Sequence, residues 1–171
     1  MSSGSKNIVL IGMPGVGKTT IGKQLACELT REFVDVDEYI EQQAGMSIPE
    51  MFAVSEEFFR EREAAVIREL SARGNMVIAT GGGVIKVAAN IQTLKSTGLV
   101  LFLNRSIDDI LVDMDADYRP LLKDNPREKL QQLYHERYDK YLGCADYTID
   151  CPLHRVDIAV AKIREIVTAN N

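Results

Sequence analysis

The chain reads IVLIGMPGVGKTT from Ile8 to Thr20. The apolar run Ile8 to Ile11 predicts a buried strand, and apolar residues at four-residue spacing over 18–29 predict a helix directly after the turn. Between these two elements the sequence matches the pattern G-x-x-x-x-G-K-[ST] at every fixed position. A strand, a glycine-rich turn and a helix in this order are typical of α/β proteins that bind phosphate groups.

The turn from Gly12 to Thr19 has the composition of a polyphosphate cradle rather than of an ordinary glycine-rich turn. Its glycines let successive backbone N–H groups face one anion, and the helix from Lys18 adds the positive end of its dipole. We expect Lys18 to reach the β- and γ-phosphates of a nucleotide and the Thr19 hydroxyl to bind Mg²⁺. The predicted nucleotide-binding residues are Gly12, Met13, Pro14, Gly15, Val16, Gly17, Lys18, Thr19 and Thr20.

Composition and charge narrow the class of protein further. The 171 residues suit one domain, and 46% hydrophobic with 26% charged residues is usual for a globular protein. A formal net charge of -5 argues against a nucleic-acid or anionic-membrane partner bound through bulk charge. The apolar runs are too short to span a bilayer. Three widely spaced cysteines without a C-x-x-C pair indicate free thiols in a reducing cytoplasm.

Strands and helices alternate along the whole chain. Further strands are predicted at 33–36, 76–79, 99–103 and 147–150, and further helices at 38–43, 88–95, 107–113, 126–142 and 156–167. Ser47 and Glu50 have the spacing of a capping box, so a helix is predicted from there to Arg73 with a break near Val54 and Ser55. This alternation predicts a parallel sheet with helices on both faces, in a single domain over 1–171.

Two aspartates, Asp35 and Asp37, lie at the end of the second predicted strand. Residues two apart in a strand face the same side, so both carboxylates are expected to point together at the carboxyl edge of the sheet, where ligands of open α/β folds bind. One carboxylate there can orient a hydroxyl or accept its proton, and the other can hold water around Mg²⁺. The alternative is a solvated turn in which the aspartates cap a helix.

Other candidate residues are arginines and glycines. Arg60 has the planar fork that binds a carboxylate at two points, although an i,i+3 surface pair with Glu63 is the plainer alternative. Thr80 precedes three glycines, which permit either close approach of the backbone to a ligand or a sharp turn. Arg119, in the polar loop 114–125, can close over a phosphate and move away again when the product is released.

The helix predicted at 126–142 adds Arg137 to these candidates. For Arg119 and Arg137 taken singly, a solvated surface role is the alternative. His135 and His154 are too isolated to indicate a metal site. Packing and surface positions are predicted for Tyr134, Tyr138, Tyr141 and Tyr147.

Taken together, these motifs resemble those of the shikimate kinases. The matching segments are, in chain order, GMPGVGKTT, DVDEYIE, SIPEMF, FFREREAAVI, TGGGV, RPLL and HERYDKY, and the similarity runs from about residue 7 to about residue 165. The resemblance implies a P-loop fold in three layers, with a five-stranded parallel sheet of order 2-3-1-4-5, a substrate-binding segment at about 37–63 and a mobile lid at about 113–125. It also implies Mg²⁺-dependent transfer of the γ-phosphoryl group of ATP to the 3-hydroxyl of shikimate, in the pathway to chorismate and the aromatic amino acids.

The resemblance implies a role for each matching residue. Asp37 would hold the acceptor hydroxyls and serve as base, Asp35 would be the outer-sphere partner of Mg²⁺, and Arg119 would be a lid arginine that also contacts ATP. The implied catalytic residues are Asp37, Lys18 and Arg119, and the implied metal-site residues are Thr19 and Asp35. The implied shikimate-binding residues are Asp37, a carboxylate clamp of Arg60 and Arg137, the orienting Glu63, and the turn Gly81, Gly82 and Gly83.

The chain departs from the family pattern at Ala79, where some relatives have a polar residue near the metal, and in two further regions. Family members often carry an arginine shortly before the lid that packs on adenine, whereas no arginine lies between Arg105 and Arg119 here, and how adenine is held is left open. The motif that begins at Arg137 has Asp139 where the family usually has proline.

Two alternatives to a shikimate kinase are left open by the sequence. One is a related kinase for another hydroxy acid, such as gluconate, because two arginines suit any carboxylate. The other is a nucleotide-gated binding module without transfer activity, favoured by the acidic segment Val112 to Asp117. As a shikimate kinase, the protein is predicted to be a monomer that acts on ATP and shikimate, with no nucleic-acid or membrane partner.

Overall fold

A five-stranded parallel sheet forms the centre of the computed structural model, which describes residues 5–114 and 124–171. The strand order is β2-β3-β1-β4-β5, as the family resemblance implied. The strands are β1 (Asn7–Ile11), β2 (Glu32–Asp35), β3 (Met76–Ala79), β4 (Gly98–Asn104) and β5 (Tyr147–Asp150). The glycine-rich turn therefore follows the central strand of the sheet.

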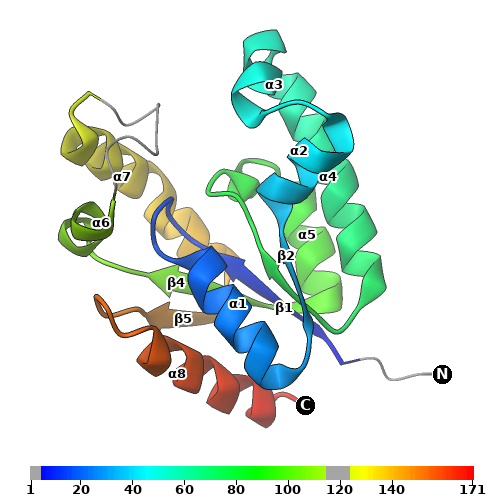
Figure 1. Ribbon diagram of the computed structural model, residues 1–171, viewed down its shortest axis with the longest axis vertical. Coiled ribbons are helices and arrows are strands. Elements are labelled where there is room, and N and C mark those ends of the chain that lie inside the picture. Colours follow the sequence, from blue (N-terminus) through cyan, green and yellow to red (C-terminus); the bar gives the residue numbers. More distant parts are fainter. Residues whose placement is uncertain (1–4, 115–123) are drawn as a thin grey trace.

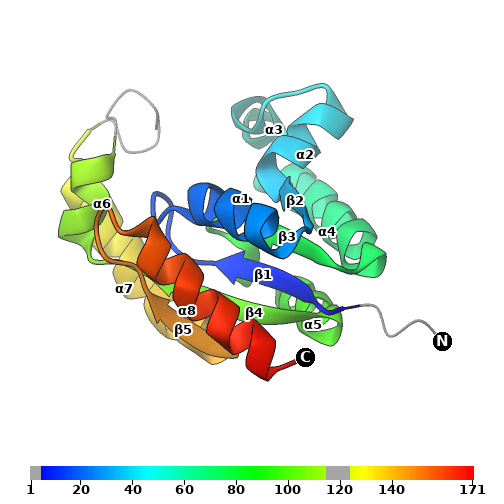
Figure 2. The same ribbon diagram turned by 60° about the horizontal axis from the view of Figure 1, so that its bottom comes forward.

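Helices cover both faces of this sheet and give three layers (Figures 1 and 2). α1 and α8 pack together on one face, whereas α4, α5 and α7 cover the other. The helices are α1 (Lys18–Leu29), α2 (Val36–Ala44), α3 (Ile48–Val54), α4 (Glu56–Arg73), the short 3-10 helix η1 (Val84–Lys86), α5 (Ala88–Thr97), α6 (Ile107–Asp113), α7 (Pro126–Cys144) and α8 (Val156–Ala169). Within the described ranges, no helix is both long and apolar enough to cross a membrane.

The central strand shows why both faces need helices. Ile8 and Leu10 face the cluster that includes α1 and α8, whereas Val9 and Ile11 face the cluster on the other side. Successive side chains of a strand point to opposite faces, so a continuous apolar run needs apolar cover on both. All four of these side chains are almost completely buried.

The second strand ends one residue earlier than predicted, and this corrects the interpretation of the two aspartates. The strand stops at Asp35, and α2 begins at Val36. Asp35 caps that helix, because its Oδ1 accepts hydrogen bonds from the backbone N–H groups of Asp37 and Glu38 at 3.0 and 3.2 Å. The prediction that Asp35 and Asp37 share one face of a strand is wrong, and the helix-capping alternative holds for Asp35.

The predicted break near Val54 and Ser55 separates α3 from α4. Ser47 and Glu50 form the predicted capping box at the start of α3. Ser55 ends α3 and caps α4 by accepting a hydrogen bond from the backbone N–H of Phe58 at 3.0 Å. The break turns the chain so that α2 and α3 stand beside the upper end of α4 (Figure 1).

The carboxyl ends of the strands point between two groups of helices (Figure 1). α2 and α3 stand on the side of β2 and β3, and α6 with the first turns of α7 stands on the side of β4. Ligands of parallel α/β sheets bind at this edge.

Candidate active site

The glycine-rich turn after β1 needs its glycines for two different reasons. Gly15 and Gly17 have φ angles of 81° and 98°, in the left-handed region that favours glycine. Gly12 has φ 151°, and a Cβ there would lie 2.6 Å from the carbonyl oxygen of Leu103. Gly17 is the N-cap of α1 and offers no side-chain cap, so the first N–H groups of α1 are left for a bound anion.

Lys18 and Thr19 are held close to this turn. The Lys18 Nζ donates to the carbonyl oxygens of Gly12 and Met13 at 2.7 and 2.9 Å. The Thr19 hydroxyl donates to Asp35 Oδ2 at 2.7 Å. Asp35 thus caps α2 with one oxygen and holds Thr19 with the other, which fixes a hydroxyl and a carboxylate side by side.

A cavity of about 800 Å³ joins the turn to both sides of the sheet edge. The turn and α1 contribute Pro14, Gly15, Gly17, Lys18, Thr19 and Thr20. The last residue of β2 and the segments after β2 and β3 contribute Asp35, Asp37, Thr80, Gly81 and Gly82. Segments on the side of β4 and β5 contribute Arg105, Asp113, Met114 and Val156. The residues predicted to bind phosphate and the predicted base Asp37 therefore line the same cavity.

Asp37 has an unusual electrostatic setting in this cavity. Its Oδ1 is buried and has no hydrogen-bond partner within the described part of the chain. A Cβ on Gly81 would lie 2.8 Å from that oxygen. Burial, followed by the negative charges of Asp35 and Glu63, raises the pKa of Asp37 to about 6 against the opposing charge of Lys18. A carboxyl group with this pKa is suited to accept a proton near neutral pH.

The three glycines after β3 form a crossing point for side chains from other elements. A Cβ on Gly82 would lie 3.0 Å from Pro14 and 3.2 Å from Arg137 Nη1, and a Cβ on Gly83 would lie 2.5 Å from Arg60 Nη2. None of the three has a positive φ angle, so space rather than backbone conformation requires glycine here. The close packing of these protein side chains requires glycine here, and the close approach of the backbone to a ligand stays a prediction.

Arg60 reaches the glycine turn from α4. Its Nη1 donates to Gly83 O at 3.0 Å and to Glu63 Oε1 at 2.8 Å, and its Nε donates to Glu56 Oε1 at 3.4 Å. The pair with Glu63 exists, but it is no surface pair, because the side chains are 15% and 1% exposed. Burial raises the pKa of Glu63, and the charge of Arg60 opposes this.

Arg137 reaches the same turn from α7, together with Tyr141, for which the sequence predicted a packing or surface position and no role in the site. Tyr141 is completely buried, and its hydroxyl donates to Gly82 O at 2.5 Å. Burial raises its pKa, and Arg137 opposes this. The two residues are four apart on one helix face, which was the available signal. α7 continues without interruption through Asp139.

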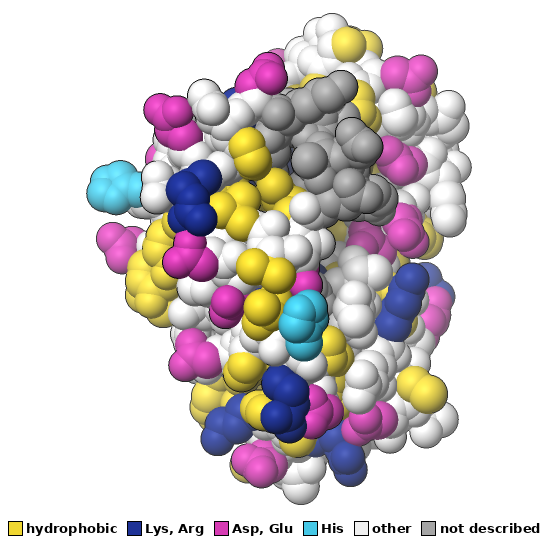
Figure 3. Space-filling view, turned by 60° about the vertical axis from the view of Figure 1, so that its left-hand side comes forward, with side chains coloured by type: hydrophobic (Ala, Val, Ile, Leu, Met, Phe, Trp, Pro, Cys, Tyr) yellow, Lys and Arg dark blue, Asp and Glu magenta, His cyan; other side chains and the backbone are white. Residues whose placement is uncertain are grey.

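Two predicted features lie outside the described residues, and two others were not predicted at all. Arg119 and most of the lid at 113–125 fall in 115–123. Arg105 and Asp113 line the cavity, although no sequence motif assigned them a role. On the face shown in Figure 3, acidic and basic side chains of the described residues are interspersed.

These observations define a P-loop phosphotransferase, in which a nucleotide cradle and a carboxylate share one cavity with arginines beside it. A family model described as "Shikimate kinase" matches residues 14–168. A shikimate kinase of Clostridium botulinum is 42% identical over 163 residues, which cover 95% of this chain and 98% of that one.

Solved structures agree with this result. A shikimate kinase from Acinetobacter baumannii in complex with shikimate has a TM-score of 0.91 and 40% identity, over 97% of this chain and 94% of the other. The enzyme from Aquifex aeolicus has a TM-score of 0.81 and 33% identity, over 96% and 97% of the two chains. The chain belongs to the shikimate kinase family, the ATP-dependent kinases that phosphorylate shikimate. The resemblance seen in the motifs is confirmed.

Proposed function

We propose that the enzyme transfers the γ-phosphoryl group of ATP to the 3-hydroxyl of shikimate, with Asp37 as the group that orients the hydroxyl and accepts its proton. The observation that carries this proposal is the buried Asp37 Oδ1 beside Gly81, without a hydrogen-bond partner among the described residues, in the same cavity as Lys18 and Thr19. A buried acceptor oxygen is costly unless a ligand donates to it. A substrate hydroxyl supplies such a donor.

The nucleotide is held by backbone N–H groups, by the start of α1 and by Lys18. These groups are fixed before substrate binds, so they stabilise charge on the phosphates without reorganising. The proposed ATP site comprises Gly12 to Thr20 and Arg119 of the lid, which lies outside the described residues.

Mg²⁺ fits beside this cradle. The Thr19 hydroxyl and the Asp35 carboxylate lie 2.7 Å apart and both line the cavity. Protein-bound Mg²⁺ commonly uses one or two such oxygens together with phosphates and water. When bound, Mg²⁺ would neutralise charge on the β- and γ-phosphates. The residues that would hold it are Thr19 directly and Asp35 through water.

The carboxylate of the acceptor is proposed to lie between Arg60 and Arg137. These arginines come from α4 and α7, and both approach the glycine turn, at Gly83 and at Gly82. Two guanidinium groups from opposite sides can bind one carboxylate at several points. Glu63 and Tyr141 hold this arrangement, because they bond Arg60 and the turn. The segment 37–63 would then be the substrate-binding part of a single domain, and 113–125 its lid.

The enzyme is also proposed to reside in a reducing compartment such as the cytoplasm and to be a monomer. The first is supported by three cysteines that are all free thiols, Cys27, Cys144 and Cys151.

Acceptor-dependent ADP release tests the proposed function. The purified enzyme with MgATP is offered shikimate, shikimate lacking the 3-hydroxyl, or gluconate, and ADP is measured in a coupled assay. Of the three acceptors, we expect only shikimate to cause ADP release. NMR of the product should show the new phosphate ester on the 3-oxygen. Equal release with gluconate, or an ester at another oxygen, would contradict the proposal.

A further inference from the structure

The cavity continues past the glycine-rich turn to polar residues that the proposed transfer does not use. Because the strand order is β2-β3-β1-β4-β5, the turn after β1 separates residues that follow β2 and β3 from residues that follow β4 and β5. Asp37 and Gly81 lie on the first side. Arg105 directly after β4, Asp113 at the end of α6 and Val156 at the start of α8 line the cavity on the second side.

Arg105 is fixed in one position on this second side. Its Nε donates to the carbonyl oxygen of Cys151 at 3.2 Å, and its Nη1 donates to Asp113 Oδ2 at 2.9 Å. The side chain is only 5% exposed. A Cβ on Gly17 would lie 3.7 Å from Nη2, so the guanidinium group lies against the glycine-rich turn. A buried, doubly bonded guanidinium is a rigid support for the carboxylate that it holds.

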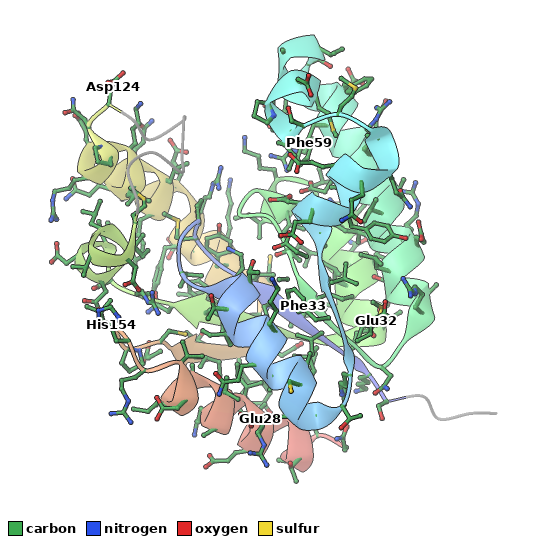
Figure 4. All side chains as sticks on the ribbon, viewed as in Figure 1. Glu28, Glu32, Phe33, Phe59, Asp124 and His154 are labelled. Atoms are coloured by element: carbon green, nitrogen blue, oxygen red, sulfur yellow. The ribbon has the colours of Figure 1, made fainter. Side chains whose placement is uncertain are left out.

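Asp113 is oriented by Arg105 and stays open to the cavity, with 35% of its side chain exposed. Its other oxygen, Oδ1, lies 3.6 Å from His154 Nδ1, which is too long for a hydrogen bond. His154 comes from the loop between β5 and α8, beside α6 (Figure 4). Oδ1 is therefore able to accept a hydrogen bond from a ligand in the cavity.

The direction of the nucleotide decides which ligand group reaches this oxygen. With the γ-phosphate toward Asp37, the ribose and base extend from the turn toward the side of Arg105 and Asp113. We infer that Asp113, positioned by Arg105, recognises the nucleobase by accepting a hydrogen bond from the exocyclic amine of adenine. This inference rests on the proposed transfer from ATP. An ionised carboxylate only accepts, so it favours an amine at position 6 of the purine over a carbonyl oxygen.

Nucleotide analogues test this inference on the unmodified enzyme. ATP is compared with inosine triphosphate, which carries a carbonyl at position 6, and with purine riboside triphosphate, which carries hydrogen there, at saturating shikimate. We expect kcat/KM to be roughly 10- to 100-fold higher for ATP than for either analogue, as for the loss of one hydrogen bond to a charged group. The difference is expected in the KM for nucleotide, with kcat little changed.

The variant Asp113→Asn tests the residue. Its amide can donate to a carbonyl oxygen, so the preference for ATP over inosine triphosphate is expected to fall by about tenfold, with the KM for shikimate unchanged. Asp108→Asn is the matched control, because Asp108 lies on the same helix, pairs with Arg127 at 2.6 Å and is largely exposed. This control is expected to keep the wild-type preference.

Two results would overturn the inference: equal use of the three nucleotides by the wild type, or an unchanged preference in Asp113→Asn. If the variant does not fold, the comparison of nucleotides on the wild type still decides. Failure of the transfer itself is a separate result, because it abolishes shikimate-dependent ADP release with ATP before any preference can be measured.

Discussion

Arg60 shows how a single side chain serves both fold and site. It bonds Glu63 and Gly83 O, and its guanidinium carbon lies 5.0 Å from the centre of the Phe59 ring. These contacts fix the guanidinium before substrate arrives, which lowers the entropic cost of binding a carboxylate. Its neighbour Arg62 instead lies over Phe58 and bonds that residue's carbonyl oxygen. The two arginines therefore form a test pair on one helix.

Arg60→Ala is expected to raise the KM for shikimate roughly 10- to 100-fold, as for the loss of hydrogen bonds to a charged group, with a much smaller change in the KM for ATP. For Arg60→Lys we expect a KM for shikimate between those of the wild type and Arg60→Ala, because lysine keeps the charge but not the planar fork. Steady-state kinetics with both substrates measures this, and Arg62→Ala serves as control. An unchanged KM for shikimate in a folded Arg60→Ala enzyme would refute the clamp.

Asp37 carries a second prediction at this scale. Its pKa is raised to about 6, chiefly by burial, so the carboxylate loses its ability to accept a proton as the pH falls through that value. We expect kcat/KM for shikimate to decrease about tenfold per pH unit below 6 and to be level above pH 7. Carboxyl ¹³C NMR of the free protein should show one group titrating near 6 that is absent in Asp37→Asn. A flat profile down to pH 5 would contradict the role as base.

At the scale of elements, the turn after β3 is where α2, α4 and α7 meet through Asp37, Arg60 and Arg137. Each of its glycines leaves room for a different one of these side chains. Tyr141, also from α7, anchors the turn through a hydrogen bond to Gly82 O. A short loop without side chains thus sets the distances between groups that come from three helices.

Gly83→Ala is expected to displace Arg60, because the new Cβ would lie 2.5 Å from Nη2 at the end of a flexible side chain. The fold should survive, while the KM for shikimate rises about tenfold through loss of one charge-assisted hydrogen bond. Gly45→Ala is the control, since Gly45 has φ 63° and no atom within 4 Å of the added Cβ. That control should cost about 1 kcal/mol in stability without changing the KM. A wild-type KM in Gly83→Ala would show that Arg60 need not contact the turn.

For the whole molecule, the site is a source of instability as well as of function. Asp37 has a higher pKa in the folded protein than the ordinary value of 3.8, so its ionised form is disfavoured by folding. The resulting cost is fully present above the folded pKa of about 6 and disappears as the pH falls to about 4. The surrounding sheet and helices must offset it at neutral pH.

Asp37→Asn is therefore expected to raise the free energy of unfolding at pH 7.5 by about 1–3 kcal/mol while abolishing phosphoryl transfer. The gain should shrink between pH 6 and pH 4, because the wild-type carboxyl is then protonated as well. Urea unfolding of both proteins at several pH values measures this difference. A variant that is less stable than the wild type at pH 7.5, or a gain that does not depend on pH, would contradict the assignment of the cost to this charge.

Local patterns along the chain were enough to predict the parallel sheet, the nucleotide cradle and the break at Ser55. Apolar runs, glycine spacing and capping residues act over a few neighbouring positions, so their effect can be read without knowing the fold. The motifs as a set also pointed to the family and, through it, to the strand order. The helix start at Val36 was predicted wrongly, because the Asp35 carboxylate accepts hydrogen bonds from two backbone N–H groups and so begins a helix where a continued strand was expected.

Contacts between distant segments could not be obtained in this way. The burial of Asp37, the anchoring of Gly82 by Tyr141 and the bond from Arg105 to the carbonyl oxygen of Cys151 all require segments from different parts of the chain to pack at one sheet edge. Desolvation and close packing arise from everything that surrounds a side chain in space. Neither depends on sequence neighbours alone, which is why a buried tyrosine and a supported aspartate look ordinary in the linear sequence.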